Sequence, residues 1–342
     1  MKKIRHNCIV SSAAYSVPNS FIKNYDENLE RVPQIGDLIF GEVTEMGHHS
    51  QLESKSVRIH TIHEGTQAVF VIGNRYAPAQ YEGIVPESAV DSLDLVGTGG
   101  VVSEVVNKNE LIGSPTKVKL LGYICDVDGK VVNTKSHIQI KPKTSKRKAK
   151  GAKLILCIGT SMDSGKTHAA AACCYSLSSM GKTVRAAKIT GTARLKDIFL
   201  MNDCGAEHVA DFTYFGYPST YMLNADELLG IFNSFDMKYG NNPKNYIVVE
   251  IADGIFQRET AMLLQMKEVR DRIHKLIFCA PDSSAVFGGV RMLLEKFDLK
   301  PDAISGLCSS SPLAIQEIQT FTKLPVLKSM ERDYKSIYEV IE

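Results

Sequence analysis

A glycine, a lysine and a threonine end a short turn between an apolar run and an alanine-rich run. The segment reads Leu154-Ile-Leu-Cys-Ile-Gly-Thr-Ser-Met-Asp-Ser-Gly-Lys-Thr167-His-Ala-Ala-Ala-Ala. The apolar run over 154–158 predicts a buried parallel strand, and 166–180 predicts a helix. A glycine-rich turn between a strand and a helix surrounds phosphate with backbone N–H groups at the helix N-terminus. We therefore expect phosphate chemistry here, with the Lys166 ammonium at the β- and γ-phosphates and the Thr167 hydroxyl on Mg²⁺.

The expected ligands are ATP and Mg²⁺. The residues expected to bind the nucleotide lie in the turn or at the start of the helix, and they are Gly159, Thr160, Asp163, Ser164, Gly165, Lys166, Thr167 and His168. The first glycine of the usual G-x-x-x-x-G-K-[ST] spacing would fall at Thr160, whereas the glycine is Gly159. The turn is therefore one residue longer than the common pattern.

Two charged residues end further predicted strands. Lys188 ends the strand over 183–188, and Glu250 ends the apolar strand over 246–250. Because ligands of parallel sheets bind at the carboxyl ends of the strands, both side chains are expected at the phosphate turn. Lys188 would stabilise an anionic substrate or a transferring phosphoryl group, and Glu250 would bind Mg²⁺ or orient a nucleophile. The alternative for Lys188 is a lysine that faces solvent at a strand end.

Two aspartates are weighed as further ligands. Asp197 begins the helix predicted over 195–203, where it would either complement the helix N-terminus or make a Mg²⁺ contact. Asp253, in the turn after the Glu250 strand, is a second choice behind Glu250. The expected catalytic residues are thus Lys166, Lys188 and Glu250, and the expected Mg²⁺ ligands are Thr167, Asp197 and Glu250.

The C-terminal part alternates apolar runs with helical patterns, which predicts a parallel sheet with helices on both faces. The predicted strands cover 154–158, 183–188, 246–250, 275–280, 303–307 and a short stretch near Val326. The predicted helices cover 166–180, 195–203, 259–272, 285–297 and 312–321. We expect this α/β domain over 152–342.

The N-terminal part, over 1–140, has short alternating runs bounded by glycines, which predict a smaller β-rich domain of the barrel or sandwich kind. Between the two parts, 141–151 is basic and carries no apolar anchor. It is interpreted as a solvated linker, and the alternative is a strap that contacts phosphate or nucleic acid. Oligonucleotide binding by the β-rich part is a minor alternative, because no aromatic stripe with interleaved basic residues is evident.

Several other polar residues have both a possible functional role and an ordinary structural one. Arg75 and Tyr76 would face a ligand or form a turn, and Arg258 would clamp an anion or pair with Glu259 at a helix start. The aromatic, turn-rich segment over 211–221 is expected near the substrate side of the sheet, with hydroxyls at Ser219, Thr220 and Tyr221. The histidines near 48–63 are expected to be ordinary surface histidines, since metal-ligand spacing is absent; they are His48, His49, His60 and His63.

The formal net charge of the 342-residue chain is +2, so charge offers no argument for nucleic acid or acidic membranes. The eight cysteines form no C-x-x-C pair and are interpreted as free thiols in a reducing compartment. Neither an export signal nor a membrane-spanning run is visible, so we expect a cytoplasmic protein without membrane contact. We also expect it to form a homodimer.

Over roughly 155–260, and more weakly to about 327, the chain resembles dethiobiotin synthetases, members of a superfamily that includes the Min-type ATPases. The resemblance rests on Gly159-Thr160 with Gly165-Lys166-Thr167, on Lys188, on Asp197 and on the segment from Val248 to Phe256. It implies a P-loop sheet, Mg²⁺ held by Thr167, Asp197 and Glu250, and Lys166 and Lys188 near the transferred phosphate. The signature lysine of Min- and ParA-type ATPases would fall at Ser161, so their paired-subunit mechanism is not expected.

Dethiobiotin synthetases have no large N-terminal β domain, and the chain looks more like a class of bacterial P-loop proteins of uncertain role that carry one. The predicted function is an ATP·Mg²⁺-dependent enzyme that activates a small carboxylate or carbamate for ligation, with an unidentified small-molecule substrate. The alternative is a nucleotide-dependent switch or regulatory ATPase whose β-rich domain binds a protein or nucleic acid.

Overall fold

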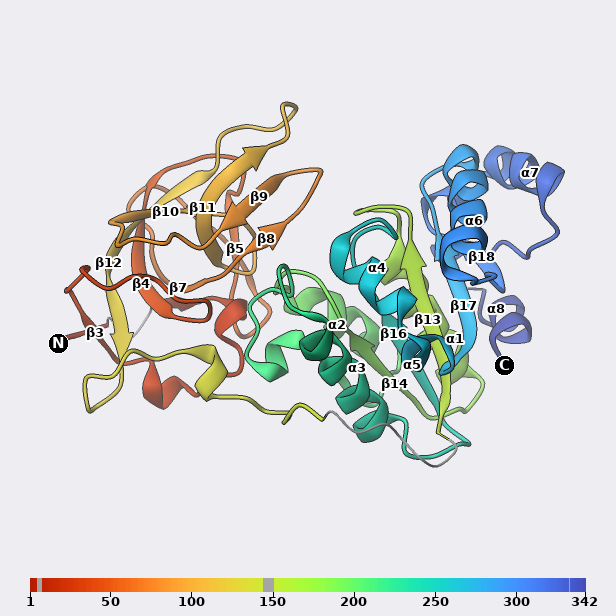
Figure 1. Ribbon diagram of the computed structural model, residues 1–342, viewed down its shortest axis with the longest axis horizontal. Helices are drawn as coiled ribbons and strands as arrows, with labels where there is room; N and C mark the ends of the chain where they lie inside the picture. The colour runs from red at the N-terminus through yellow and green to blue at the C-terminus, as the bar shows by residue number, and fades with distance from the viewer. Residues whose placement is uncertain (5–7, 144–150, 332) are drawn as a thin grey trace. The chain divides into compact units, whose positions relative to one another are not determined.

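The computed structural model describes residues 1–4, 8–143, 151–331 and 333–342 (Figure 1). The chain forms two compact units. The β-rich unit comprises Met1–Lys141, Gly191–Lys196 and Phe212–Met222, and the sheet unit comprises Pro142–Thr190, Asp197–Asp211 and Leu223–Glu342. The basic stretch predicted as a linker lies for the most part, over 144–150, outside the described residues.

The sheet unit is built on six parallel strands in the order β15-β14-β16-β13-β17-β18. Their bounds are β13 Lys153–Gly159, β14 Val184–Lys188, β15 Val209–Asp211, β16 Tyr246–Glu250, β17 Ile273–Cys279 and β18 Ala303–Ser305. The helices are α1 Lys166–Ser179, α2 Leu195–Asp203, α3 Ala225–Tyr239, α4 Arg258–Gln265, α5 Lys267–Arg270, α6 Ser283–Phe297, α7 Pro312–Phe321 and α8 Tyr334–Ile341. The first two residues of α2 belong to the β-rich unit.

Helices cover both faces of the parallel sheet, because its strands are apolar on both sides. Ile277 and Cys279 share a buried cluster with the alanines of α1 and with Ile337 and Ile341 of α8. Phe278, between them, points to the opposite face, as alternation along a strand requires. There the position of a Cβ on Gly289 of α6 would lie only 2.2 Å from the Phe278 ring. The α/β fold with a parallel sheet between helices, predicted from the sequence, is confirmed.

In the β-rich unit five strands pair in a closed ring, in the order β4-β7-β11-β10-β12 and back to β4. They are β4 Leu38–Glu45, β7 Gln67–Ile72, β10 Ser92–Leu95, β11 Val101–Lys108 and β12 Thr116–Cys125. All five strands contribute to one buried apolar cluster, with Ile39, Phe70, Leu93, Val102 and Val118 among its members, which is how a small barrel fills its interior. The predicted β-rich architecture is confirmed as a small barrel.

Shorter strands extend this ring or lie beside it. They are β1 Lys2–Lys3, β2 Ile9–Val10, β3 Asn24–Asp26, β5 Gln51–Glu53, β6 Ile59–Thr61, β8 Arg75–Tyr76 and β9 Tyr81–Ile84. The strands β5 and β6 form a separate two-stranded sheet.

Some sequence predictions differ from the structure. The helix predicted over 259–272 is two helices, because Met266 between α4 and α5 adopts an extended backbone with ψ of 121°. Within the segment over 211–221, Asp211 ends β15 of the sheet unit, and the residues from Phe212 onward belong to the β-rich unit. Among the residues that the structure describes, no helix has the length and apolar character needed to cross a membrane.

Candidate nucleotide-binding site

The predicted phosphate-binding turn connects β13 to α1. The backbone N–H of Thr160 donates to the carbonyl of Cys279 on β17 over 3.0 Å, which ties the turn to the neighbouring strand. Gly165 has a φ of 93°, and a Cβ there would lie 2.8 Å from the Cα of Gly306. Only glycine combines that backbone with so close a neighbour. The turn therefore fixes the N-terminus of α1 at the carboxyl ends of the central strands, where the N–H groups of the helix favour an anion.

Lys166 folds back onto this turn. Its ammonium donates to the Ser161 carbonyl over 2.6 Å and lies 3.4 Å from the Ser164 hydroxyl. The residue is only 6% exposed. Burial lowers the pKa of Lys166, and the carboxylate of Glu250 opposes that effect. The turn thus encloses a cation, as a binding site for a phosphate chain would require.

Lys188 lies between two carboxylates beside the same helix start. Its Nζ is 2.5 Å from Oδ2 of Asp197 and 3.3 Å from Oε1 of Glu250. The same Oε1 accepts a hydrogen bond from the Thr167 hydroxyl over 3.1 Å. Burial alone would lower the pKa of Lys188, but the two carboxylates outweigh it and hold that pKa above its ordinary value. The structure therefore brings Thr167, Lys188, Asp197 and Glu250 into one network.

The sheet register explains why these side chains meet. Glu250 of β16 pairs with Lys188 of β14 on one side and with Cys157 of β13 on the other. Neighbours in register point to the same face of a parallel sheet, and here that face is the one covered by α1. Thr167, in the first turn of α1, stands above this row.

One oxygen of this network has no partner among the described residues. Glu250 is 1% exposed, and its Oε2 is buried without a hydrogen bond. A buried carboxylate oxygen left in this way is costly unless a cation or a donor reaches it. The hydroxyl of Thr167 and the carboxylates of Asp197 and Glu250 are hard oxygen ligands of the kind Mg²⁺ prefers. The residues predicted to hold Mg²⁺ thus fit that ion.

Of the remaining residues predicted to contact the nucleotide, some are buried and others are exposed. Ser164 is buried within the turn, and the Thr160 hydroxyl is buried without a partner among the described residues. Asp163, with a φ of 60°, and His168 of α1 are exposed. Their exposure leaves both side chains available to a ligand at the rim of the turn.

Two glycines that pack against the turn were not singled out from the sequence. A Cβ on Gly254, after Glu250, would lie 2.2 Å from the Thr160 carbonyl oxygen. A Cβ on Gly306, after β18, would lie 2.2 Å from the Ser164 carbonyl oxygen, and the N–H of Leu307 donates to that same oxygen. The sequence signal was a glycine shortly after a buried strand, directly after β18 for Gly306 and four residues after β16 for Gly254, because glycine permits close backbone approach.

Arg258 has an ordinary structural role in the sheet unit. Its guanidinium donates to the carbonyl of Leu223 over 2.9 Å and pairs with Glu259 over 2.5 Å. Of the two roles expected for Arg258, the pair with Glu259 is the one that the structure contains.

Several polar residues of the β-rich unit have partners within that unit. The Tyr221 hydroxyl donates to Glu82 over 2.6 Å, and the N–H of Gly191 donates to the Thr220 hydroxyl over 2.9 Å. His49 is 6% exposed, so the expectation of a surface histidine is wrong there. Burial, with Arg75 and His48, lowers the pKa of His49 to about 3. Among the described residues no group of three or more His, Cys, Asp or Glu is placed to hold a metal ion.

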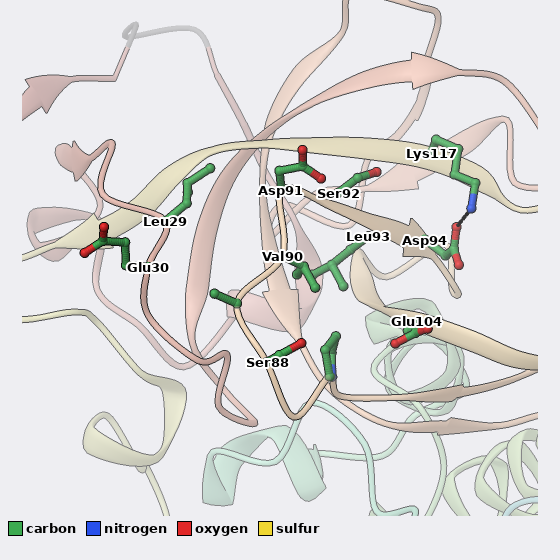
Figure 2. Close-up of a pocket in the computed structure, with 12 residues that line it drawn as sticks. Leu29, Glu30, Ser88, Val90, Asp91, Ser92, Leu93, Asp94, Glu104 and Lys117 are labelled. Atoms are coloured by element: carbon green, nitrogen blue, oxygen red, sulfur yellow. Dashed lines mark hydrogen bonds and ion pairs between the residues drawn. The ribbon is translucent and has the colours of Figure 1, made fainter.

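A hollow of about 840 Å³ lies in the β-rich unit (Figure 2). Its lining includes the carboxylates of Glu30, Asp91, Asp94 and Glu104, and the ammonium of Lys117 lies 2.6 Å from Asp94. Phosphate groups would be repelled by such a lining. The hollow is therefore a poor match for a nucleotide, unlike the turn in the sheet unit.

No family model matches the chain, and no curated protein matches it either. Similar solved structures include the signal recognition particle receptor FtsY from Elizabethkingia anophelis in complex with GDP, which is 10% identical with a TM-score of 0.38 and covers 54% of this chain. The chain spans 58% of the length of that receptor chain.

A ParA family ATPase from Chlorobium tepidum TLS is 13% identical with a TM-score of 0.36, over 56% of this chain and 93% of its own. A DUF1611 family protein from Anabaena variabilis is 15% identical with a TM-score of 0.38, over 59% of this chain and 62% of its own. Each of these matches covers between 54% and 59% of this chain.

Proposed function

We propose that the sheet unit is an ATP·Mg²⁺-dependent enzyme that transfers the γ-phosphate to a small carboxylate or carbamate and so activates it for ligation. The observation that carries this proposal is the position of Lys188. Its ammonium is buried between Asp197 and Glu250, next to Thr167 at the start of α1. A second fixed cation beside the phosphate-binding turn is suited to the charge that develops on a transferring phosphoryl group.

Each residue has a distinct role in this proposal. The turn over 159–165 and the N-terminus of α1 bind the phosphate chain, and Lys166 neutralises its β- and γ-oxygens. Thr167, Asp197 and Glu250 would hold Mg²⁺, which supplies positive charge to the phosphate oxygens when bound. Lys188 stabilises the anionic acceptor or the transferring group. Catalysis of this kind depends on positioning and electrostatics, and the transferred phosphoryl group is bonded to the substrate and not to the protein.

A nucleotide-dependent switch is the second candidate, and one observation favours it. The residues Gly191–Lys196, which connect Lys188 to Asp197 along the chain, belong to the β-rich unit. A change at the nucleotide would therefore be carried by the chain itself into that unit. In this alternative the β-rich unit binds a protein or nucleic-acid partner.

For either candidate function, we still predict that the protein is cytoplasmic and forms a homodimer.

The test is hydrolysis of ATP, and of GTP in parallel, by the pure protein with Mg²⁺. The wild type is compared with Lys166→Ala, Lys188→Ala and Glu250→Gln, each with and without pools of small carboxylates and amines. The enzyme proposal expects turnover that one small-molecule pool raises and that all three substitutions remove. Tight nucleotide binding with no turnover under any addition would contradict it and favour the switch. Stimulation by a protein or nucleic acid would favour the switch as well.

A further inference from the structure

The residue directly before α2 has no acceptor to offer to the first turn of that helix. The residue before α2 is Arg194, and arginine has donors but no acceptor for the free N–H groups of a first turn. The acceptor comes from far away in the chain. The N–H of Leu195 donates to Oε2 of Glu53 over 2.8 Å, and the N–H of Lys196 donates to Oε1 over 2.9 Å.

Glu53 is built rigidly into the β-rich unit. It is fully buried, and its own N–H donates to the Thr98 carbonyl over 2.7 Å. Next to Thr98, a Cβ on Gly99 would lie 1.8 Å from the Ala193 carbonyl oxygen, so the backbone before α2 lies directly on this loop. A buried carboxylate is tolerated where its oxygens are satisfied, and here two backbone donors at a helix N-terminus satisfy both.

The helix capped in this way carries a residue of the candidate site. Asp197 is the third residue of α2 and directly follows Lys196. Its carboxylate is 2.5 Å from the ammonium of Lys188. A helix start that loses its cap frays within its first turn, and this is the turn that holds Asp197.

We propose that Glu53 is a positioning residue for the nucleotide site: it holds the first turn of α2 and thereby sets Asp197 against Lys188. This inference rests on the proposed function for its catalytic consequence, but its structural part is independent of it.

The structural part is tested by hydrogen–deuterium exchange on the full chain without nucleotide. Glu53→Gln places an amide NH₂ where one carboxylate oxygen accepted an N–H, and Glu64→Gln, at an exposed glutamate, is the matched control. Peptides covering 191–203 are expected to exchange about tenfold faster or more in Glu53→Gln, and peptides of β13 and α1 to keep their rates. Unchanged exchange over 191–203 would overturn the proposal, as would faster exchange throughout the chain.

The catalytic part is tested by a double-mutant cycle with Asp197→Asn, read as kcat and KM for Mg²⁺-dependent ATP hydrolysis. If Glu53 acts through Asp197, the double variant is no slower than the slower single variant. Multiplied effects of the two substitutions on kcat/KM would overturn the proposal, since they would show that Glu53 acts elsewhere. A wild type without hydrolysis would contradict the proposed function alone, and the exchange experiment would still decide whether Glu53 holds the helix.

Discussion

Lys188 and Glu250 stand in register on the neighbouring strands β14 and β16, with the ammonium of one 3.3 Å from a carboxylate oxygen of the other. Because the pKa of Lys188 is held above its ordinary value, the lysine keeps its charge at neutral pH and above. A buried cation of this kind, on a strand that only β16 separates from β13 and the predicted phosphate-binding turn, is the basis of the proposed chemistry.

Lys166→Ala is expected to remove nucleotide turnover. The ammonium that folds onto the turn is the group proposed to meet the β- and γ-phosphates, and loss of one preorganised donor commonly costs about 10²–10³-fold in kcat. The measurement is steady-state hydrolysis with equilibrium nucleotide binding. Lys182→Ala, at an exposed lysine after α1, is the control and should retain wild-type turnover. Wild-type kinetics in Lys166→Ala would show that the turn has a purely structural role.

Glu250→Ala is expected to destabilise the fold as well as the site. It leaves Lys188 buried with one carboxylate partner and takes the acceptor from the Thr167 hydroxyl. Breaking a buried ion pair costs about 3–5 kcal/mol, and the remaining contact to Asp197 puts the expected loss near the lower value. Urea unfolding followed by circular dichroism measures it. Glu295→Ala, in an exposed pair with Arg291, should leave the midpoint unchanged, and an equally small effect at Glu250 would refute the network.

Gly254→Ala is expected to weaken nucleotide binding more than it weakens the fold. The added Cβ would lie 2.2 Å from the Thr160 carbonyl oxygen, so the turn itself must shift. Gly288→Ala in α6 is the matched control, because nothing lies within 4 Å of that Cβ position. It should raise stability by about 0.5–1 kcal/mol, since alanine is the better helix residue. Nucleotide titration and thermal unfolding of both variants separate the effects, and equal affinities would argue against contact between the turn and the nucleotide.

His49 predicts a pH dependence of stability. Its pKa is lowered to about 3 in the folded protein and is about 6.5 in an unfolded chain, so between these values only the unfolded state binds the proton. Stability is therefore full above about pH 6.5 and falls as pH decreases toward 3, by at most about 1.4 kcal/mol per pH unit from this group.

Urea unfolding between pH 4.5 and 7 tests the pH dependence. His49→Gln should show a shallower loss than the wild type, and His63→Gln, at an exposed histidine, should follow the wild type. Parallel curves for the wild type and His49→Gln would exclude His49 as the cause.

Local pattern was enough to predict most of the sheet unit. The strand over 246–250 and the helices over 195–203 and 312–321 match β16, α2 and α7 at both ends. Apolar runs and capping residues act within a few positions, so the sequence carries these elements directly. The helix predicted over 259–272 failed because its pattern runs through an extended residue, Met266, which tertiary packing accommodates.

Other features were not predicted from the sequence. The strand β15 and the helices α3 and α8 are missing from the predicted elements, although Asn224 and Glu227 form a capping box at the start of α3. The burial of His49 was missed because it depends on what packs around the residue rather than on its neighbours in sequence.

The sequence by itself determined the glycine-containing turn between β13 and α1, the parallel sheet and the charged residues at its strand ends, because glycine spacing and apolar periodicity are local properties. The tertiary structure alone decided that Lys188 would lie between Asp197 and Glu250, and that Glu53 would cap a helix 142 residues further along the chain. Such contacts arise only when strand register and packing bring distant segments together.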